Sequence, residues 1–185
     1  MINKAIQFAT VCHQKQTRKG TEIPYILHCL EAGTIAARLT NNDDEVDTNV
    51  VAAAILHDTI EDAHVSYELI KEAFNENIAH LVRCQSEDKT KQWVDRKQDM
   101  IDFLKENKSK AVEIATLSDK LSNMRAIDKE YQIKKEKIWE KFNAGKESQR
   151  WYYNAIAESL IQVRDTNEYK EYRRLIETTY AKGND

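Results

Sequence analysis

One proline and four glycines in 185 residues leave this chain few residues that interrupt a helix. Proline removes a backbone donor and glycine costs conformational entropy, so their scarcity favours long helical segments. Apolar residues also recur at three- and four-residue spacing, as one buried face of a helix requires. The sequence therefore predicts an all-α fold. The expected helices cover residues 2–11, 26–39, 50–56, 67–74, 78–82, 100–104, 111–127, 133–142, 151–163 and 169–180.

The length of 185 residues suits one domain built around one core. We expect a single domain over residues 1–185, with its functional motifs within roughly residues 1–165 and a C-terminal helix over 166–182. Residues 41–45, Asn-Asn-Asp-Asp-Glu, predict an acidic linker whose carboxylates favour the start of the next helix. Residues 85–97 are charged and weakly periodic, and predict an irregular segment near the functional site.

The composition, with 41% hydrophobic and 32% charged residues, is that of a soluble globular protein. No apolar run approaches the roughly 20 residues that span a bilayer, and residues 1–10 lack the features of an export signal. A net charge of −3 argues against a general nucleic-acid binder. Cys12, Cys29 and Cys84 form no Cys-x-x-Cys pair, so we expect reduced core thiols in a cytoplasmic protein.

His57 and Asp58 stand side by side at the end of the apolar run 51–56. The alanine-rich composition of this run favours a helix over a strand. If the helix continues, Glu61 lies above His57 and Asp62 lies above Asp58. Four polar side chains would then converge on one patch. Two of them could hold a divalent metal ion, and two could orient water or a substrate.

Two further segments supply candidate partners for this pair. His28 lies on a predicted helix whose other face is apolar, although a lone buried histidine is more often a core residue than a ligand. Asp119 interrupts an apolar helix, and Asn123 follows one turn later on the same face. A buried carboxylate needs a cation, several donors or a metal. The residues alone leave a metal site and a hydrogen-bonded core both open.

The order His28, His57-Asp58, Asp119 resembles the H…HD…D signature of the HD metal-dependent phosphohydrolases, an all-α superfamily. Three blocks are similar to the hydrolase half of RelA/SpoT-type enzymes and to the stand-alone small alarmone hydrolases. They are Arg18-Lys-Gly-x-x-x-Pro24-Tyr-x-x-His28, Leu56-His57-Asp58-Thr-Ile-Glu61-Asp62 and Ser118-Asp119-Lys-Leu-Ser-Asn123-Met. The resemblance implies a single-domain HD fold and manganese-dependent hydrolysis of the 3′-pyrophosphate of (p)ppGpp to GDP or GTP and pyrophosphate.

Six residues match the reactive centre of that family. Four match its metal ligands, namely His28, His57, Asp58 and Asp119. Two match the acidic pair that places and activates the attacking water, namely Glu61 and Asp62. Two nitrogen and two oxygen donors suit manganese, iron or magnesium better than a thiolate-type zinc site. The resemblance therefore implies Mn²⁺ as cofactor, with Fe²⁺ or Mg²⁺ as the alternative ions.

Further residues match the family's substrate contacts. Arg18 and Lys19 match the basic pair of the loop that contacts the nucleotide, with the guanidinium stacked on the base. Asn123 matches an asparagine on the ribose and phosphate side. Lys89 resembles the lysine of an Asp-Asp-Lys-Thr block, from which Ser86 and Glu87 of this chain depart. The implied partner is a small-molecule guanine nucleotide, with no nucleic acid or membrane, and the chain's assembly is open, a homo-oligomer included.

The leaving pyrophosphate carries several negative charges, so a basic surround is needed as well. Lys146 and Arg150 are one helical turn apart and could supply it, with Tyr153 as a nearby hydroxyl donor. The alternative is a solvated helix start before an aromatic core stripe. In the preceding residues 129–141, lysines alternate with glutamates, which predicts a solvated helix face.

Two other functions remain open for this sequence. The first is an HD phosphohydrolase for another nucleotide, such as a deoxynucleotide or a nucleotide-derived cofactor. The pair Glu61-Asp62 together with Arg18-Lys19 favours the alarmone, because many general HD phosphatases lack that combination. The second is a non-catalytic nucleotide-binding or scaffold protein, which the intact candidate ligands and the Glu-Asp pair disfavour.

Overall fold

The computed structural model describes residues 1–40, 47–107 and 109–181. These residues contain no β-strand, so the predicted all-α fold is confirmed, and none of their helices could cross a membrane. The predicted linker 41–45 lies outside them, as does residue 182 of the predicted C-terminal helix. The helices are α1 (Ile2–Cys12), α2 (Ile26–Leu39), α3 (Thr48–Leu56), α4 (Thr59–Ala63), α5 (Tyr67–Ala73), α6 (Glu76–Gln85), α7 (Trp93–Glu106), α8 (Lys110–Lys134), α9 (Lys146–Ser159) and α10 (Asn167–Thr179), with a 3₁₀ helix η1 (Lys135–Lys141).

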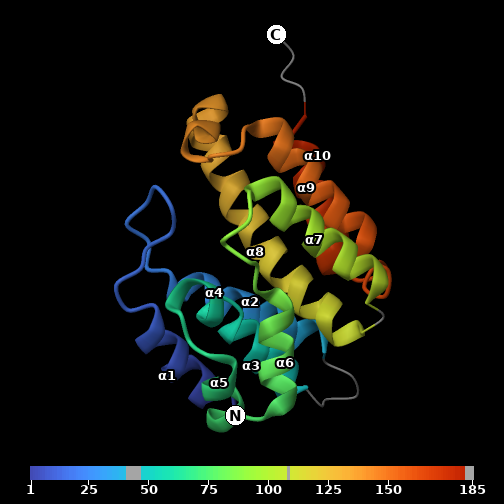
Figure 1. Cartoon of the computed structure of the whole chain (residues 1–185). Helices are drawn as coiled ribbons and strands as arrows, with labels where there is room; N and C mark the ends of the chain where they lie inside the picture. The colour runs from blue at the N-terminus through green and yellow to red at the C-terminus, as the bar shows by residue number, and fades with distance from the viewer. Residues whose placement is uncertain (41–46, 108, 182–185) are drawn as a thin grey trace.

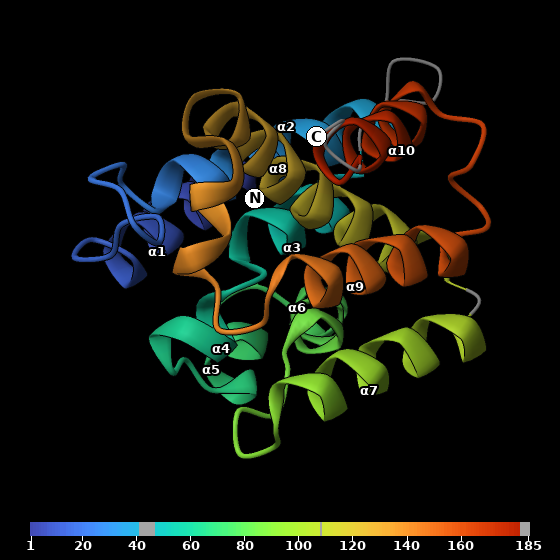
Figure 2. The same ribbon diagram turned by 90° about the horizontal axis from the view of Figure 1, so that it is seen from above.

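The longest helix, α8, runs through the molecule and carries the other elements around it (Figure 1). It packs against α2, α3, α6, α10 and η1, and its side chains Leu117, Leu121 and Met124 are fully buried. Seen from above, α7 and α9 lie side by side (Figure 2). Some α8 side chains face α2 and α3, and others, such as Lys120, face α9.

A close approach of α2 and α3 brings two of the predicted site residues together. Gly33 of α2 lies against Ile55 of α3, where a β-carbon on Gly33 would stand only 2.4 Å from Ile55 Cγ1. Glycine has no β-carbon, so the two helices can approach this closely. His28 near the start of α2 and His57 just after α3 consequently face each other.

The predicted continuous helix through His57 and Asp62 is wrong. Helix α3 ends at Leu56, and α4 begins only at Thr59. Side chains replace helical backbone donors at this break, because His57 Nδ1 binds the carbonyl oxygen of Ala54 at 2.8 Å and Thr59 Oγ1 donates to that of Leu56 at 2.6 Å. The break lets His57 and the acidic residues of α4 turn toward the same centre.

Two other predicted boundaries also differ. The sequence predicts an irregular segment over residues 85–97, but α7 already begins at Trp93. The expected helix 133–142 is divided, because α8 ends at Lys134 and the 3₁₀ helix begins at Lys135, which has a φ of 52°. Burial of Trp139, which is 8% exposed, folds this 3₁₀ helix back against α8 and brings Lys141 near the site.

Candidate active site

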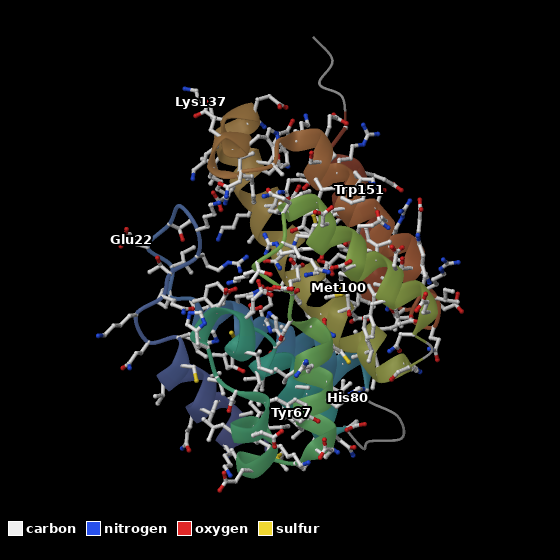
Figure 3. All side chains as sticks on the ribbon, in the orientation of Figure 1. Glu22, Tyr67, His80, Met100, Lys137 and Trp151 are labelled. Carbon is white, nitrogen blue, oxygen red and sulfur yellow. The ribbon has the colours of Figure 1, made fainter. Side chains whose placement is uncertain are left out.

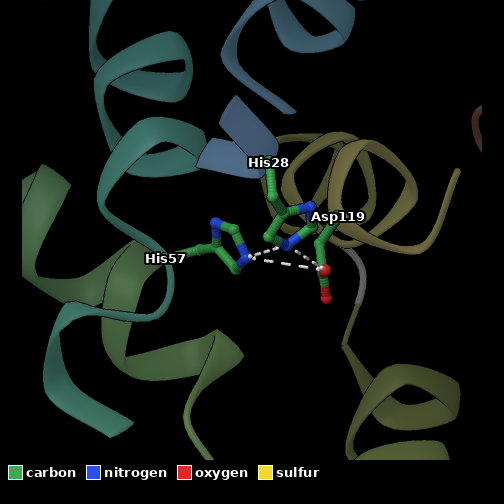
Figure 4. A group of neighbouring side chains, drawn as sticks. All are labelled: His28, His57 and Asp119. Carbon is green, nitrogen blue, oxygen red and sulfur yellow. Dashed lines mark hydrogen bonds and ion pairs between the residues drawn. The ribbon is translucent and has the colours of Figure 1, made fainter. Parts of the chain in front are cut away.

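Two histidines and an aspartate form the centre of the candidate site (Figure 4). His28 comes from α2, His57 from the turn after α3, and Asp119 from the middle of α8. The two Nε2 atoms are 3.1 Å apart, and Asp119 Oδ1 lies 3.3 Å from His28 Nε2 and 3.5 Å from His57 Nε2. All three residues are buried, and one atom of each lies within 4.8 Å of the other two. Such a group can hold a metal ion.

The hydrogen bonds behind the imidazoles decide which nitrogen faces the centre. His57 Nδ1 lies 2.8 Å from the carbonyl oxygen of Ala54, which can only accept, so Nδ1 carries the hydrogen. Ser122 donates its hydroxyl to Glu31 Oε2 at 2.7 Å, and its oxygen then accepts from His28 Nδ1 at 2.8 Å. Both histidines therefore direct an Nε2 lone pair at the same point.

Asp58 adds a second carboxylate to this centre. Its Oδ2 lies 2.7 Å from His57 Nε2 and 3.6 Å from His28 Nε2, and it accepts a hydrogen bond from the Tyr25 hydroxyl at 2.6 Å. Two lone pairs and two carboxylates thus converge in a buried place, which is unfavourable without a cation among them. The mixed nitrogen and oxygen donor set fits a divalent metal ion.

The pKa shifts of the centre show how strongly its two carboxylates favour a positive charge between them. Burial alone would lower the pKa of His57, but Asp58 and Asp119 raise it well above its usual value. Burial alone would raise the pKa of both carboxyls; His57 beside Asp58, and Lys120 beside Asp119, hold the pKa of each well below its usual value. The two carboxylates stay ionised and attract a cation.

The acidic pair of α4 lies beside this centre, with each member held differently. Asp62 pairs with Lys89, and its Oδ2 lies 3.5 Å from the Tyr25 hydroxyl that also binds Asp58. Glu61 Oε2 accepts from the backbone N–H of Glu87 at 3.1 Å, and Lys89 Nζ lies 3.6 Å from its other oxygen. Burial, and then the Glu87 carboxylate, raises the pKa of Glu61. A carboxylate with a raised pKa is suited to accept a proton.

The basic loop before α2 reaches the same centre. Arg18 Nη2 donates to Asn123 Oδ1 at 2.7 Å, and Asn123 Nδ2 donates to Asp119 Oδ1 at 2.5 Å. Gly20, with a φ of 74°, lets the loop turn in a backbone conformation that other residues rarely adopt. Glu22 projects from the loop away from the helices (Figure 3), so Arg18 finds its partner on α8 and not in its own loop.

A cavity of about 490 Å³ opens beside Arg18. Its lining includes five residues that the sequence analysis proposed, namely Arg18, Lys19, Asp62, Asn123 and Tyr153. Lys141 of η1 also lines it and pairs with Glu130 at 2.5 Å. Lys141 belongs to the stretch that the sequence predicts as a solvated helix face. That prediction misses its place in the cavity lining, because alternating charges carry no sign that η1 folds back.

The structure does not bring Lys146 and Arg150 to this cavity. Lys146 Nζ is held by Glu136 Oε1 at 2.9 Å, on the side of η1. Arg150 lies 3.7 Å from Glu147 of its own helix, and its side chain is 42% exposed. Their predicted role in binding pyrophosphate therefore has no support in their contacts. Only Tyr153 of that group lines the cavity.

Several residues for which the sequence motifs predict no role support the site. The Tyr25 hydroxyl donates to Asp58 and lies near Asp62. Its position in the first sequence block, directly before α2, is a signal that could have identified it. Ser122 and Glu31 orient His28, and each lies three residues after a candidate ligand. Lys120 donates to Asp119 Oδ2 at 2.6 Å. A lysine or serine inside a helix gives no sequence signal of such a contact.

A single-domain helical fold with two histidines and two aspartates at a buried centre defines a metal-dependent phosphohydrolase of the HD class. The HD domain family model matches residues 5–147 of this chain. The protein therefore belongs to the HD domain family.

Relatives with assigned activities are similar to most of the chain. A Xenopus tropicalis protein named guanosine-3′,5′-bis(diphosphate) 3′-pyrophosphohydrolase MESH1 is 34% identical over 69% of this chain and 69% of its own length. The Drosophila melanogaster protein of the same name is 32% identical over 67% of this chain and 68% of its own. An Aquifex aeolicus 3′-pyrophosphohydrolase is 43% identical over 44% of this chain but only 11% of its own length.

Two solved structures share the fold. The crystal structure of lmo0812 from Listeria monocytogenes has a TM-score of 0.74 and 26% identity, and the match covers 84% of this chain and 99% of that one. A metazoan ortholog of SpoT, described as hydrolysing ppGpp and acting in starvation responses, has a TM-score of 0.77 and 24% identity, with 96% and 94% covered. At that identity the second likeness establishes the fold alone.

Proposed function

We propose that this protein hydrolyses the 3′-pyrophosphate of (p)ppGpp, releasing GDP or GTP and pyrophosphate. One observation carries the proposal: the nucleotide-loop residue Arg18 is joined through Asn123 to Asp119 in the buried His-His-Asp group. A nucleotide held by the loop would thus have its phosphates at the metal centre. The names of the MESH1 relatives support the same substrate.

His28, His57, Asp58 and Asp119 would hold the metal ion, which we propose to be Mn²⁺, with Fe²⁺ or Mg²⁺ as alternatives. Such an ion lowers the pKa of bound water and neutralises charge that develops on phosphate oxygens. The protein contributes the orientation of the ligands. Ala54 and Ser122 fix the two imidazoles, and Tyr25 fixes the Asp58 carboxylate.

Glu61 and Asp62 would handle the attacking water. The water oxygen bonds to the phosphorus attached to the 3′ oxygen, the bond from that phosphorus to the 3′ oxygen breaks, and one water proton passes to Glu61. The 3′ oxygen leaves with a proton from solvent. The raised pKa of Glu61 suits it to accept this proton. Lys89, which lies beside both carboxylates, would hold the pair in place and approach the phosphate.

The cavity of about 490 Å³ would bind the nucleoside and the 5′-phosphates. Arg18 would stack on the base, as a planar guanidinium can, with its other face 5.6 Å from the Tyr25 ring centroid. Lys19 and Tyr153 would donate to polar groups of the nucleotide, and Asn123 would face its ribose. Lys141, which lines the same cavity, would add a cation for the 5′-phosphates.

The test is product analysis after incubation of the manganese-loaded protein with ppGpp. GDP and pyrophosphate should appear, and Asp119→Ala should abolish both. Release of free phosphate from ordinary nucleotides, with ppGpp untouched, would instead favour an HD phosphohydrolase for another nucleotide. The cytoplasmic location and the assembly of the protein stay predictions.

A further inference from the structure

Two half-buried lysines from different helices pack against one tyrosine beside the metal-binding group. Lys97 of α7 lies with its Nζ 4.7 Å from the ring centroid of Tyr152 of α9, and Lys120 of α8 lies 5.6 Å from the same centroid. The two lysine side chains are only 16% and 12% exposed. Lysines are seldom covered to this extent unless they are paired, and these two pair with Glu87 and Asp119.

The position of Lys120 ties this cluster to the reactive centre. Lys120 Nζ lies 2.6 Å from Asp119 Oδ2, while the other oxygen of Asp119 lies 3.3 Å from His28 Nε2. One carboxylate therefore separates the ammonium from the candidate metal position. The nucleotide cavity is lined by α8 residues from Asn123 onward, so Lys120 stands beyond its inner end.

Each carboxylate beside the two lysines also has another positive partner. Glu87 lies 2.5 Å from Lys97 and 3.4 Å from Arg96, so one carboxylate serves two cations. A divalent ion at the centre would be balanced by Asp58 and Asp119, so Lys120 would share the charge of the Asp119 carboxylate with that ion. Burial, and then the neighbouring Lys120, lowers the pKa of Lys97. Buried positive charge of this kind favours an anion.

The hydroxyl of Tyr152 is a second, independent sign of a ligand. Tyr152 is 3% exposed, and its hydroxyl has no hydrogen-bond partner in the part of the chain that the structure describes. Burial raises the pKa of this hydroxyl, and the Tyr152 ring centroid lies 4.7 Å from Lys97 Nζ and 5.6 Å from Lys120 Nζ, which places the residue within the cluster. A buried donor without a partner is costly, and a phosphate oxygen could accept from it.

We propose that Lys97, Lys120 and Tyr152 form the subsite that receives the pyrophosphate group cleaved from the substrate. This inference rests on the proposed function and assigns to these residues the role that the sequence predicts for Lys146 and Arg150, whose contacts are with Glu136 and Glu147. Two ammonium groups and a hydroxyl can donate to several oxygens of a diphosphate at once. The nucleoside in the outer cavity and the diphosphate in this inner subsite would place the scissile bond at the metal centre between them.

Binding of inorganic pyrophosphate tests the subsite without relying on turnover. The manganese-loaded protein is titrated calorimetrically with the manganese complex of pyrophosphate, and separately with GDP. Lys97→Met, which keeps most of the side-chain length and removes the charge, should weaken pyrophosphate binding by about tenfold or more and change GDP binding little. Lys97→Arg should recover part of the loss. Lys105→Met, an exposed position on the same helix, is the matched control and should bind both ligands as the parent does.

Tyr152→Phe removes a single oxygen, so it gives an answer even if Lys97→Met fails to fold. It should weaken pyrophosphate binding by about threefold or more, with unchanged metal content. Pyrophosphate binding that is equal in Tyr152→Phe, Lys105→Met and the parent would overturn the subsite, as would an equal loss of GDP binding. If the protein leaves ppGpp intact but loses pyrophosphate binding in these variants, the subsite stands and the proposed substrate is wrong.

Discussion

Arg18 donates from Nη2 to the side-chain oxygen of Asn123 at 2.7 Å, although 105 positions separate the two residues in the sequence. Asn123 in turn donates to Asp119 at 2.5 Å. One amide thus connects a cation of the substrate loop to a carboxylate of the metal-binding group. A substrate that breaks the bond between Arg18 and Asn123 would therefore act on a residue that is hydrogen-bonded to Asp119.

Replacement of Arg18 tests the identity of the substrate. Arg18→Ala should raise the KM for ppGpp by on the order of tenfold, because a charge-assisted contact and a stacking surface are lost. Arg18→Lys should recover only part of the loss, since an ammonium cannot stack in the same way. Metal content should change little. Lys15→Ala, an exposed position nearby, serves as the control. If both Arg18 variants hydrolyse ppGpp as well as the parent, the general nucleotide phosphohydrolase becomes the better assignment.

Two variants separate metal binding from water activation. Asp119→Ala should empty the site, because it removes the oxygen nearest to both imidazoles. Glu61→Gln should leave the metal content nearly intact and lower kcat by on the order of 10² or more. Metal content is measured by elemental analysis of the purified variants, and kcat with ppGpp. An equal loss of metal in both would contradict this division of roles.

The pH dependence of kcat should report Glu61. Its pKa is raised by burial and by the Glu87 carboxylate, and it acts as a base only when ionised. Activity should therefore rise with pH through a pKa above the usual glutamate value. Glu87→Gln should move this acid limb to lower pH, because the neighbouring charge is removed. For stability the sign is opposite: the contribution of Glu61 is present below its unfolded pKa and lost as pH rises through its folded pKa. An unmoved acid limb would exclude Glu61 as the titrating base.

Helical periodicity is a local pattern, and it predicts α2 and α8. The adjacency of His57 and Asp58 suggests a site, but the four metal ligands are a prediction from the resemblance to the HD family, because the residues alone leave a hydrogen-bonded core open. Contacts between distant segments carry no such local signal. The fold-back of η1, which brings Lys141 to the cavity, depends on burial of Trp139 against elements far along the chain. The break after Leu56 depends on side-chain hydrogen bonds that periodicity does not register.

Packing between α2 and α3 can be tested at Gly33. Gly33→Ala should destabilise the protein by about 1–3 kcal/mol, because a β-carbon would overlap Ile55 Cγ1 at 2.4 Å. Ile55→Ala in the same chain should relieve the overlap, so the double variant should be more stable than the sum of the two single losses predicts. Gly145→Ala, where no atom lies within 4 Å, is the control for losing a glycine. Thermal or urea unfolding measures the difference, and strict additivity would exclude the clash.

The serine behind His28 should control metal affinity without touching the metal. Ser122 accepts from His28 Nδ1 at 2.8 Å and donates to Glu31 at 2.7 Å, so it fixes the imidazole with Nε2 toward the centre. Ser122→Ala leaves Nδ1 without this partner and should weaken manganese binding by roughly 10- to 100-fold. Ser122→Thr keeps the hydroxyl and should restore most of the affinity. Ser118→Ala, a buried serine one turn earlier whose hydroxyl donates to the Ile114 carbonyl oxygen, controls for loss of a buried hydroxyl. Equal affinity in Ser122→Ala and Ser118→Ala would show that the hydroxyl does not orient His28.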